Sequence, residues 1–99
     1  MTTESMTAPC KPKLKQPPLY KVIFFNDDIS TFQCVMDILV NYFNKSEDAA
    51  YELAFKVHIE GSATAGIYPK DIAESKISLA NSELKSNGFP LHIELTKSI

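Results

Sequence analysis

The chain has 99 residues, of which 44% are hydrophobic and 10% aromatic, values that fit a single globular domain at most. No stretch approaches the roughly 18 consecutive apolar residues of a membrane-spanning helix. Residues 1–10 lack the basic start and apolar block of a secretory signal, and Glu4 with no arginine argues against an organelle transit peptide. The sequence therefore predicts a cytoplasmic protein with no membrane segment.

The charged residues and cysteines argue against several classes of ligand. All ten basic residues are lysine, and the formal net charge is −2. Arginine is the usual bidentate hydrogen-bond donor to phosphates and guanine edges. Because the chain has no arginine, it is a poor candidate for binding nucleic acid or nucleotides. The three glycines form no phosphate-binding loop, and Cys10 and Cys34 lack the spacing of a zinc site or a disulfide framework. We expect no metal and no cofactor.

Residues 1–18 are predicted to be a flexible N-terminal extension, because they hold four of the six prolines and show little apolar periodicity. The run 19–25, LYKVIFF, then predicts a strand that stops at the turn-forming residues 26–28. Ser30 or Thr31 can cap the helix that follows, which ends near Asn44. Its apolar stripe has helical spacing and consists of Phe32, Val35, Met36, Leu39, Val40 and Phe43.

A second helix is predicted from Ser46, a capping residue followed by two acids, to the helix stop Gly61. Its buried stripe is Ala50, Leu53, Ala54 and Val57. Residues 63–68 predict a short strand, and Pro69 suits the first turn of a third helix that stops at residues 87–88. One face of that helix is predicted to carry Ile72, Ala73, Lys76, Ile77, Ala80 and Leu84. Residues 91–95 alternate as a strand, with Leu91, Ile93 and Leu95 facing inward.

The predicted element order is β-α-α-β-α-β, which indicates an α+β domain over residues 19–99. The economical packing is a sandwich in which one three-stranded antiparallel sheet carries all three helices on one face.

Two features of the sequence could carry chemistry: the triplet Asn26-Asp27-Asp28 after the first strand, and His58 late in the second helix. Each has an ordinary structural interpretation: the triplet as a solvated turn, and His58 as a half-buried helix residue. A metal site lacks local ligand spacing. An acid–base enzyme using Asp28 and His58 lacks a plausible nucleophile in either motif.

The same residues make better sense as a binding site. A carboxylate, an amide oxygen and an imidazole nitrogen all accept hydrogen bonds, and an ammonium group offers three donors and no acceptor. The apolar residues Phe32, Val35, Ala54 and Val57 are next to them in sequence. Such a site would suit a free α-amino group followed by a bulky first side chain.

These residues resemble the ClpS adaptor family. The resemblance is carried in order by residues 20–28 (YKVIFFNDD), Val57-His58 with Gly61, residues 73–76 (AESK), and Pro90-Leu91, and it spans about residues 17–99. It implies a βααβαβ sandwich like the C-terminal domain of a ribosomal stalk protein. It also implies a non-enzymatic adaptor that binds N-degrons, free N-termini beginning with Leu, Phe, Tyr or Trp, and delivers them to the ClpA unfoldase of the ClpAP protease.

The resemblance also implies roles for single positions. Asn26, Asp28 and His58 match residues that hold the degron's α-amino group and first peptide unit, whereas Asp27 matches a structural position. The side-chain pocket is matched by Ser30 at its rim and by Val35, Val57 and Leu91 in its walls. Three residues match contacts to the N-terminal domain of ClpA: Asp71, Glu74 and Lys76. The N-terminal extension matches a flexible segment used in substrate hand-off, and we expect the protein to be a monomer.

Two positions depart from the family pattern, which usually has methionine where this chain has Phe32 and Ala54. Phe32 matches a gatekeeper that excludes β-branched first residues. A stiff ring opposite a small alanine should reshape the pocket, and we expect it to favour aromatic first residues over leucine. The alternative to a degron adaptor is a general protein-interaction module of the same fold that has no such pocket.

Overall fold

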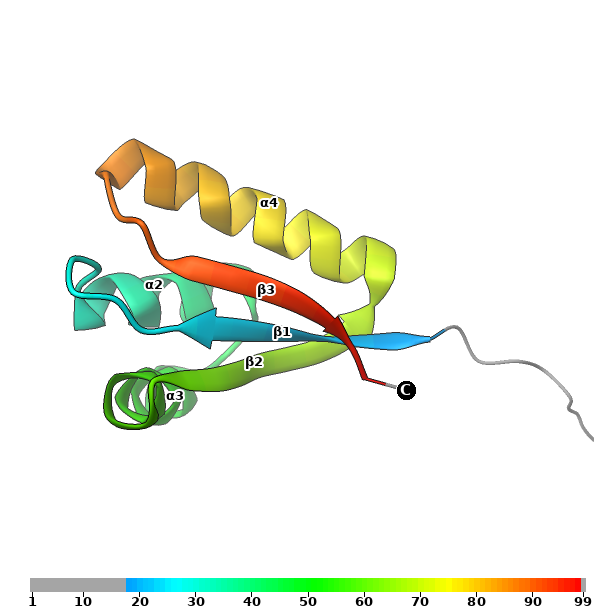
Figure 1. Ribbon diagram of the computed structural model, residues 1–99, viewed down its shortest axis with the longest axis horizontal. Helices are drawn as coiled ribbons and strands as arrows, with labels where there is room; N and C mark the ends of the chain where they lie inside the picture. Colours follow the sequence, from blue (N-terminus) through cyan, green and yellow to red (C-terminus); the bar gives the residue numbers. More distant parts are fainter. Residues whose placement is uncertain (1–17, 99) are drawn as a thin grey trace, which may run out of the picture.

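The computed structural model of the protein describes residues 18–98, and Figure 1 shows its arrangement. The elements follow the predicted order: β1 (Leu19–Phe25), α2 (Phe32–Tyr42), α3 (Glu47–Glu60), β2 (Ser62–Pro69), α4 (Lys70–Asn87) and β3 (His92–Lys97). The predicted α+β class is confirmed. The predicted N-terminal extension lies outside the described residues except for Pro18.

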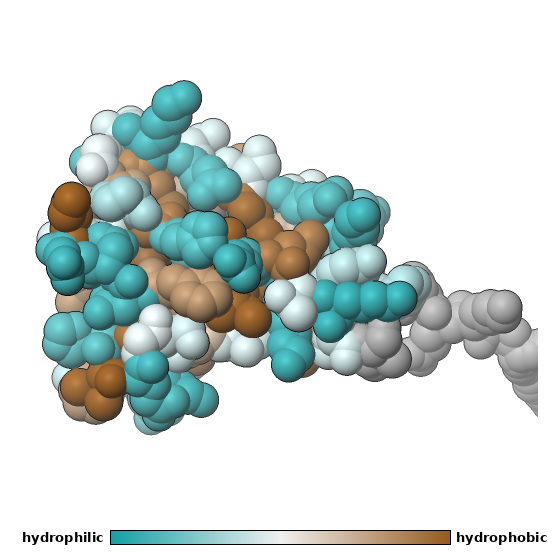
Figure 2. Space-filling view, in the orientation of Figure 1, coloured by the Kyte–Doolittle hydropathy of each residue, from teal (hydrophilic) through white to brown (hydrophobic). Residues whose placement is uncertain are grey.

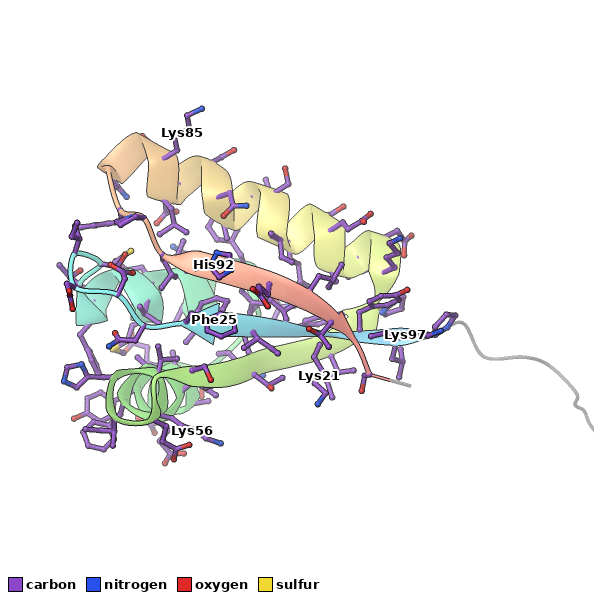
Figure 3. The ribbon with its side chains drawn as sticks, in the orientation of Figure 1. Lys21, Phe25, Lys56, Lys85, His92 and Lys97 are labelled. Atoms are coloured by element: carbon purple, nitrogen blue, oxygen red, sulfur yellow. The ribbon has the colours of Figure 1, made fainter. Side chains whose placement is uncertain are left out.

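The three strands form one antiparallel sheet in the order β2-β1-β3, so the first strand is the central one. Phe25 pairs with Ser62 on one side and with His92 on the other. In the view of Figure 1, α2 lies behind the sheet, α4 runs above β3 and α3 lies below β2, while the face toward the viewer carries no helix. On that open face the rings of Phe25 and His92 lie side by side, with centroids 5.4 Å apart (Figure 3).

Helix ends are set by local residues, largely as predicted. The Thr31 hydroxyl accepts from the Cys34 amide at 3.0 Å and begins α2, while the Ser46 hydroxyl accepts from the Ala49 amide at 3.1 Å and begins α3. Gly61 and Gly88 end α3 and α4 with φ values of 91° and 77°, a left-handed conformation that glycine adopts without steric cost. Because these signals are local, they could be found in the sequence.

The core lies between the sheet and the helices. Its largest fully buried side chains come from β1, α2 and the residue that ends α2: Val22, Phe24, Ile38, Leu39 and Phe43. The Phe24 and Phe43 rings meet edge to face at 5.4 Å, which links the sheet to the end of α2. Each such side chain contributes about 1.5–3 kcal/mol by burial, so this cluster fixes how α2 is placed on β1.

Two predicted stripes differ from the structure. Helix α2 also buries Cys34 and Ile38, which its predicted stripe left out. In α4 the residues Ala73, Ala80 and Leu84 are buried, but Ile72 is 45% exposed. Residue 72 lies about 100° around the helix from residue 73, so once the small alanines face the sheet, Ile72 turns outward. In the part of the chain that the structure describes, no helix is long and apolar enough to cross a membrane.

Candidate functional site

The turn after β1 is fastened to the end of α3. The Asn26 amide donates to the Gly61 carbonyl at 2.9 Å. Gly61 ends the helix that carries His58 in its last turn. Two segments far apart in sequence, the triplet and the end of α3, are thereby held at one corner of the molecule.

Asp27 organises the turn from within. Its Oδ1 accepts from the Ile29 amide at 2.8 Å and from the Ser30 amide at 2.7 Å. Burial alone would raise the pKa of this carboxyl, but its interactions with Ser30 and Ile29 together lower the pKa below its ordinary value. Asp27 therefore stays ionised and shapes the loop that presents its neighbours.

Between this turn, α2 and α3 lies a cavity of about 390 Å³, which we call the α2–α3 cavity. It brings together every residue predicted for the peptide pocket except Leu91. The residues that line it are Asn26, Asp27, Asp28, Ser30, Thr31, Phe32, Val35, Ala54, Val57 and His58. Residues from the triplet and from two helices thus form one concave site.

Leu91 and Thr31 are the two differences from the predicted set. Leu91 is 6% exposed and belongs to the hydrophobic core, because it precedes β3 with its side chain turned inward in phase with Ile93. Thr31 lines the cavity although the sequence indicated it only as a helix cap. Its place directly after the turn was the available signal, because the residue that starts α2 must also border the turn.

The polar side of the cavity is rich in hydrogen-bond acceptors. Asn26, Asp28 and His58 are exposed, whereas Asp27 and Ser30 are partly buried. Within residues 18–98, the buried Asp27 Oδ2 and Ser30 Oγ atoms have no hydrogen-bond partner. Because these two atoms are buried, the exposed groups of Asn26, Asp28 and His58 are the ones that a ligand can reach.

The apolar side is formed by Val35, Ala54 and Val57, which are at most 6% exposed. Phe32 completes it from the first turn of α2. The Phe32 ring packs edge to face on Tyr51 of α3, with centroids 5.2 Å apart and planes at 63°. The ring is thus held between the cavity and α3, as a wall of the cavity.

The residues predicted to bind a partner lie elsewhere, on the first half of α4. Asp71 and Glu74 are exposed, whereas Lys76 is partly buried. Asp71 and Lys76 line one shallow groove with Tyr42, and Glu74 lines another with Ile93. The structure therefore places the three on one helix without joining them in a single depression.

Lys76 makes structural contacts that the sequence did not indicate. Its Nζ donates to the Tyr42 carbonyl at 3.0 Å, at the end of α2. The same ammonium lies 5.1 Å from the centroid of the Tyr68 ring and 5.9 Å from that of Phe43. Because α2 has no basic residue in its last turn, Lys76 supplies the positive charge that the carbonyl end of this helix favours.

The groups of this site suit binding better than catalysis. No group of three His, Cys, Asp or Glu side chains able to hold a metal ion occurs among the described residues. Burial, followed by the negative charge of Glu83, raises the pKa of the Cys34 thiol to about 11. A protonated, buried thiol is a poor nucleophile. What the cavity offers is a set of acceptors beside an apolar wall.

Comparison with known proteins places the chain among adaptors. Residues 15–94 match the family described as "ATP-dependent Clp protease adaptor protein ClpS". A ClpS adapter of Clostridium acetobutylicum is 42% identical over 85 residues, covering 86% of this chain and 84% of the relative. One from Wolinella succinogenes is 45% identical over 76 residues, covering 77% and 74%.

A solved structure agrees with these relatives. Agrobacterium tumefaciens ClpS2 bound to L-phenylalaninamide superposes with a TM-score of 0.79 at 35% identity. The match covers 84% of this chain and all of the other. The ligand of that protein is an amino-acid amide with a free α-amino group and an aromatic side chain.

Proposed function

The chain belongs to the ClpS family of Clp protease adaptors, and from this premise we propose that the α2–α3 cavity binds the N-terminal residue of N-degron substrates. The bound residues would be Leu, Phe, Tyr or Trp with a free α-amino group. The family is one of adaptors, so the chain would select proteins for degradation and carry out no reaction itself.

The observation that carries this proposal is the two-sided lining of the cavity. Asn26, Asp28 and His58 supply acceptors for an ammonium group and the first peptide unit. Val35 and Val57 supply an apolar wall for the first side chain. Hydrogen bonds to a charged group contribute about 1.5–3 kcal/mol each, and burial of a Leu or Phe side chain adds about as much. After the cost of association, micromolar affinity is within reach, at roughly −8 kcal/mol.

ClpS adaptors interact with the ATPase of the Clp protease and with its substrates. We propose that this chain does so through the N-terminal domain of a ClpA-type unfoldase, in the cytoplasm. Asp71 and Glu74 support this because they are exposed charges on α4, away from the α2–α3 cavity. The N-terminal extension, residues 1–18, would serve in handing the substrate to the unfoldase.

The test is a fluorescence titration with a Phe-first peptide, compared with the same peptide N-acetylated. Acetylation removes the charge and leaves the acceptors unpaired, so we expect affinity to fall at least about tenfold. Asp28→Ala and His58→Ala should each weaken binding while the thermal midpoint stays within a few degrees. Equal binding of the acetylated peptide would favour a general interaction module and contradict the proposal.

A further inference from the structure

Helix α3 carries a row of exposed apolar side chains at four-residue spacing. Tyr51 is 54% exposed, Phe55 50% and Ile59 63%. The buried side of the same helix is made by Ala50, Ala54 and Val57, so this row is not needed for the core. Figure 2 shows hydrophobic atoms at the surface over α3, at the lower left.

The row is continuous with the α2–α3 cavity. Phe32 lines the cavity, and its ring centroid lies 5.2 Å from that of Tyr51. The Tyr51 ring in turn stacks on the Phe55 ring, with centroids 6.4 Å apart and planes at 11°. Phe55 also lies one helical turn before His58, so residues three apart place it beside the acceptor side of the cavity. The aromatic surface therefore starts at the cavity wall and leads outward.

A substrate that leaves the cavity along α3 passes over this surface. An extended peptide advances about 3.3 Å per residue, so its second and third residues lie within roughly 7 Å of the first. Tyr51 lies one step of 5.2 Å beyond Phe32, and Phe55 a second step of 6.4 Å beyond Tyr51, so the side chains at these positions of the peptide extend its reach toward the two rings. Two rings that are already stacked lose little conformational freedom when a third apolar group covers them.

We propose that Tyr51 and Phe55 form an accessory subsite that binds an apolar or aromatic side chain at the second or third position of the substrate. This inference rests on the proposed function, because it assumes that the first residue occupies the cavity. It makes α3 a second determinant of specificity, one that ranks substrates sharing the same first residue.

The experiment uses three peptides with a C-terminal fluorophore that begin Phe-Ser-Ser, Phe-Phe-Ser and Phe-Ser-Phe. One aromatic contact should make the better of the last two bind about threefold to tenfold more tightly than the first. In Phe55→Gln that gain should disappear, while binding of Phe-Ser-Ser stays within about twofold of wild type. Phe55 is the residue to change, because its ring stacks on Tyr51, whereas Tyr51 also packs against the cavity wall.

A matched control is Ile67→Thr, which removes a 49% exposed apolar side chain from β2, away from the cavity, and should leave all three affinities unchanged. Failure of every peptide to bind would overturn the proposed function. Binding without any aromatic gain, or a gain that persists in Phe55→Gln, would overturn the accessory subsite alone. An equal loss for all three peptides in Phe55→Gln would also overturn it, because Phe55 would then belong to the first-residue pocket.

Discussion

Lys76 stands among the residues proposed to contact the unfoldase, yet its ammonium is engaged inside the domain. It donates to the Tyr42 carbonyl at 3.0 Å and lies over the rings of Phe43 and Tyr68. We predict that Lys76→Met, which keeps the length and apolar character of the stem, destabilises the fold.

The size of this effect follows from the contacts. A hydrogen bond from a charged donor contributes about 1.5–3 kcal/mol, a cation at a helix C-terminus about 0.3–1, and each cation–π contact about 0.5–1. Since one ammonium makes them all and is partly hydrated, they are not additive, and about 1–3 kcal/mol is the reasonable total. For a domain of this size, each kcal/mol lowers the thermal midpoint by about 4–8 °C.

The assay is thermal unfolding by circular dichroism, with Lys56→Met as a control because Lys56 is exposed on α3 (Figure 3). We expect a clear fall in the midpoint for Lys76→Met and almost none for Lys56→Met. Unchanged stability in Lys76→Met, together with impaired delivery to the protease, would refute the reasoning. Lys76 would then act only through the partner.

Two further predictions concern the cavity. Asp27→Ala removes the acceptor for the Ile29 and Ser30 amides and should cost about 1–2 kcal/mol of stability, measured by urea unfolding. Because the folded-state pKa of Asp27 is lowered, the wild-type advantage should be full at neutral pH and shrink as the pH falls below the ordinary value of 3.8; an advantage independent of pH would contradict it. The second prediction is checked by measuring dissociation constants for peptides that differ only in their first residue. The wild-type protein should bind peptides beginning with Phe, Tyr or Trp more tightly than those beginning with Leu, and should bind those beginning with Ile or Val poorly. Phe32→Ala should weaken that preference and relax the exclusion of Ile and Val. A Leu-first peptide bound about tenfold better than Phe by wild type would show that the ring fills the cavity.

The parts of the fold that the sequence predicted correctly depend on neighbouring residues. Ser46 begins α3 because its hydroxyl reaches an amide three residues on. Gly88 ends α4 because the chain there takes a left-handed turn. The alternation of residues 91–95 placed Ile93 and Leu95 toward the core, where they pack. These signals act over one helical turn or one strand step, so a single sequence contains them.

The parts that sequence reasoning missed depend on packing between distant elements. Ile72 shared a predicted stripe with Ala73, but which of the two turns inward is set by how closely α4 approaches the sheet. The bond from Lys76 to the end of α2, and the contact of Phe32 with Tyr51, each join residues from different elements. Neither has a local signature. Hydrogen-bond chemistry and nearness in sequence collected the acceptors and four apolar residues of the cavity, and the family resemblance added Ser30 and Leu91.

The order of the strands has a consequence for how the chain reaches its folded state. Because β1 is central, it pairs with two strands that come much later in the sequence: Phe25 pairs with Ser62, and Tyr20 with Lys97. Within residues 18–98 no hairpin joins consecutive strands, so closing the sheet requires long loops to close first, which slows folding. During synthesis β1 must remain unpaired on its β3 side until the last strand has left the ribosome. The Asn26 to Gly61 bond forms only when β1 meets β2, so the cavity would be assembled together with that half of the sheet.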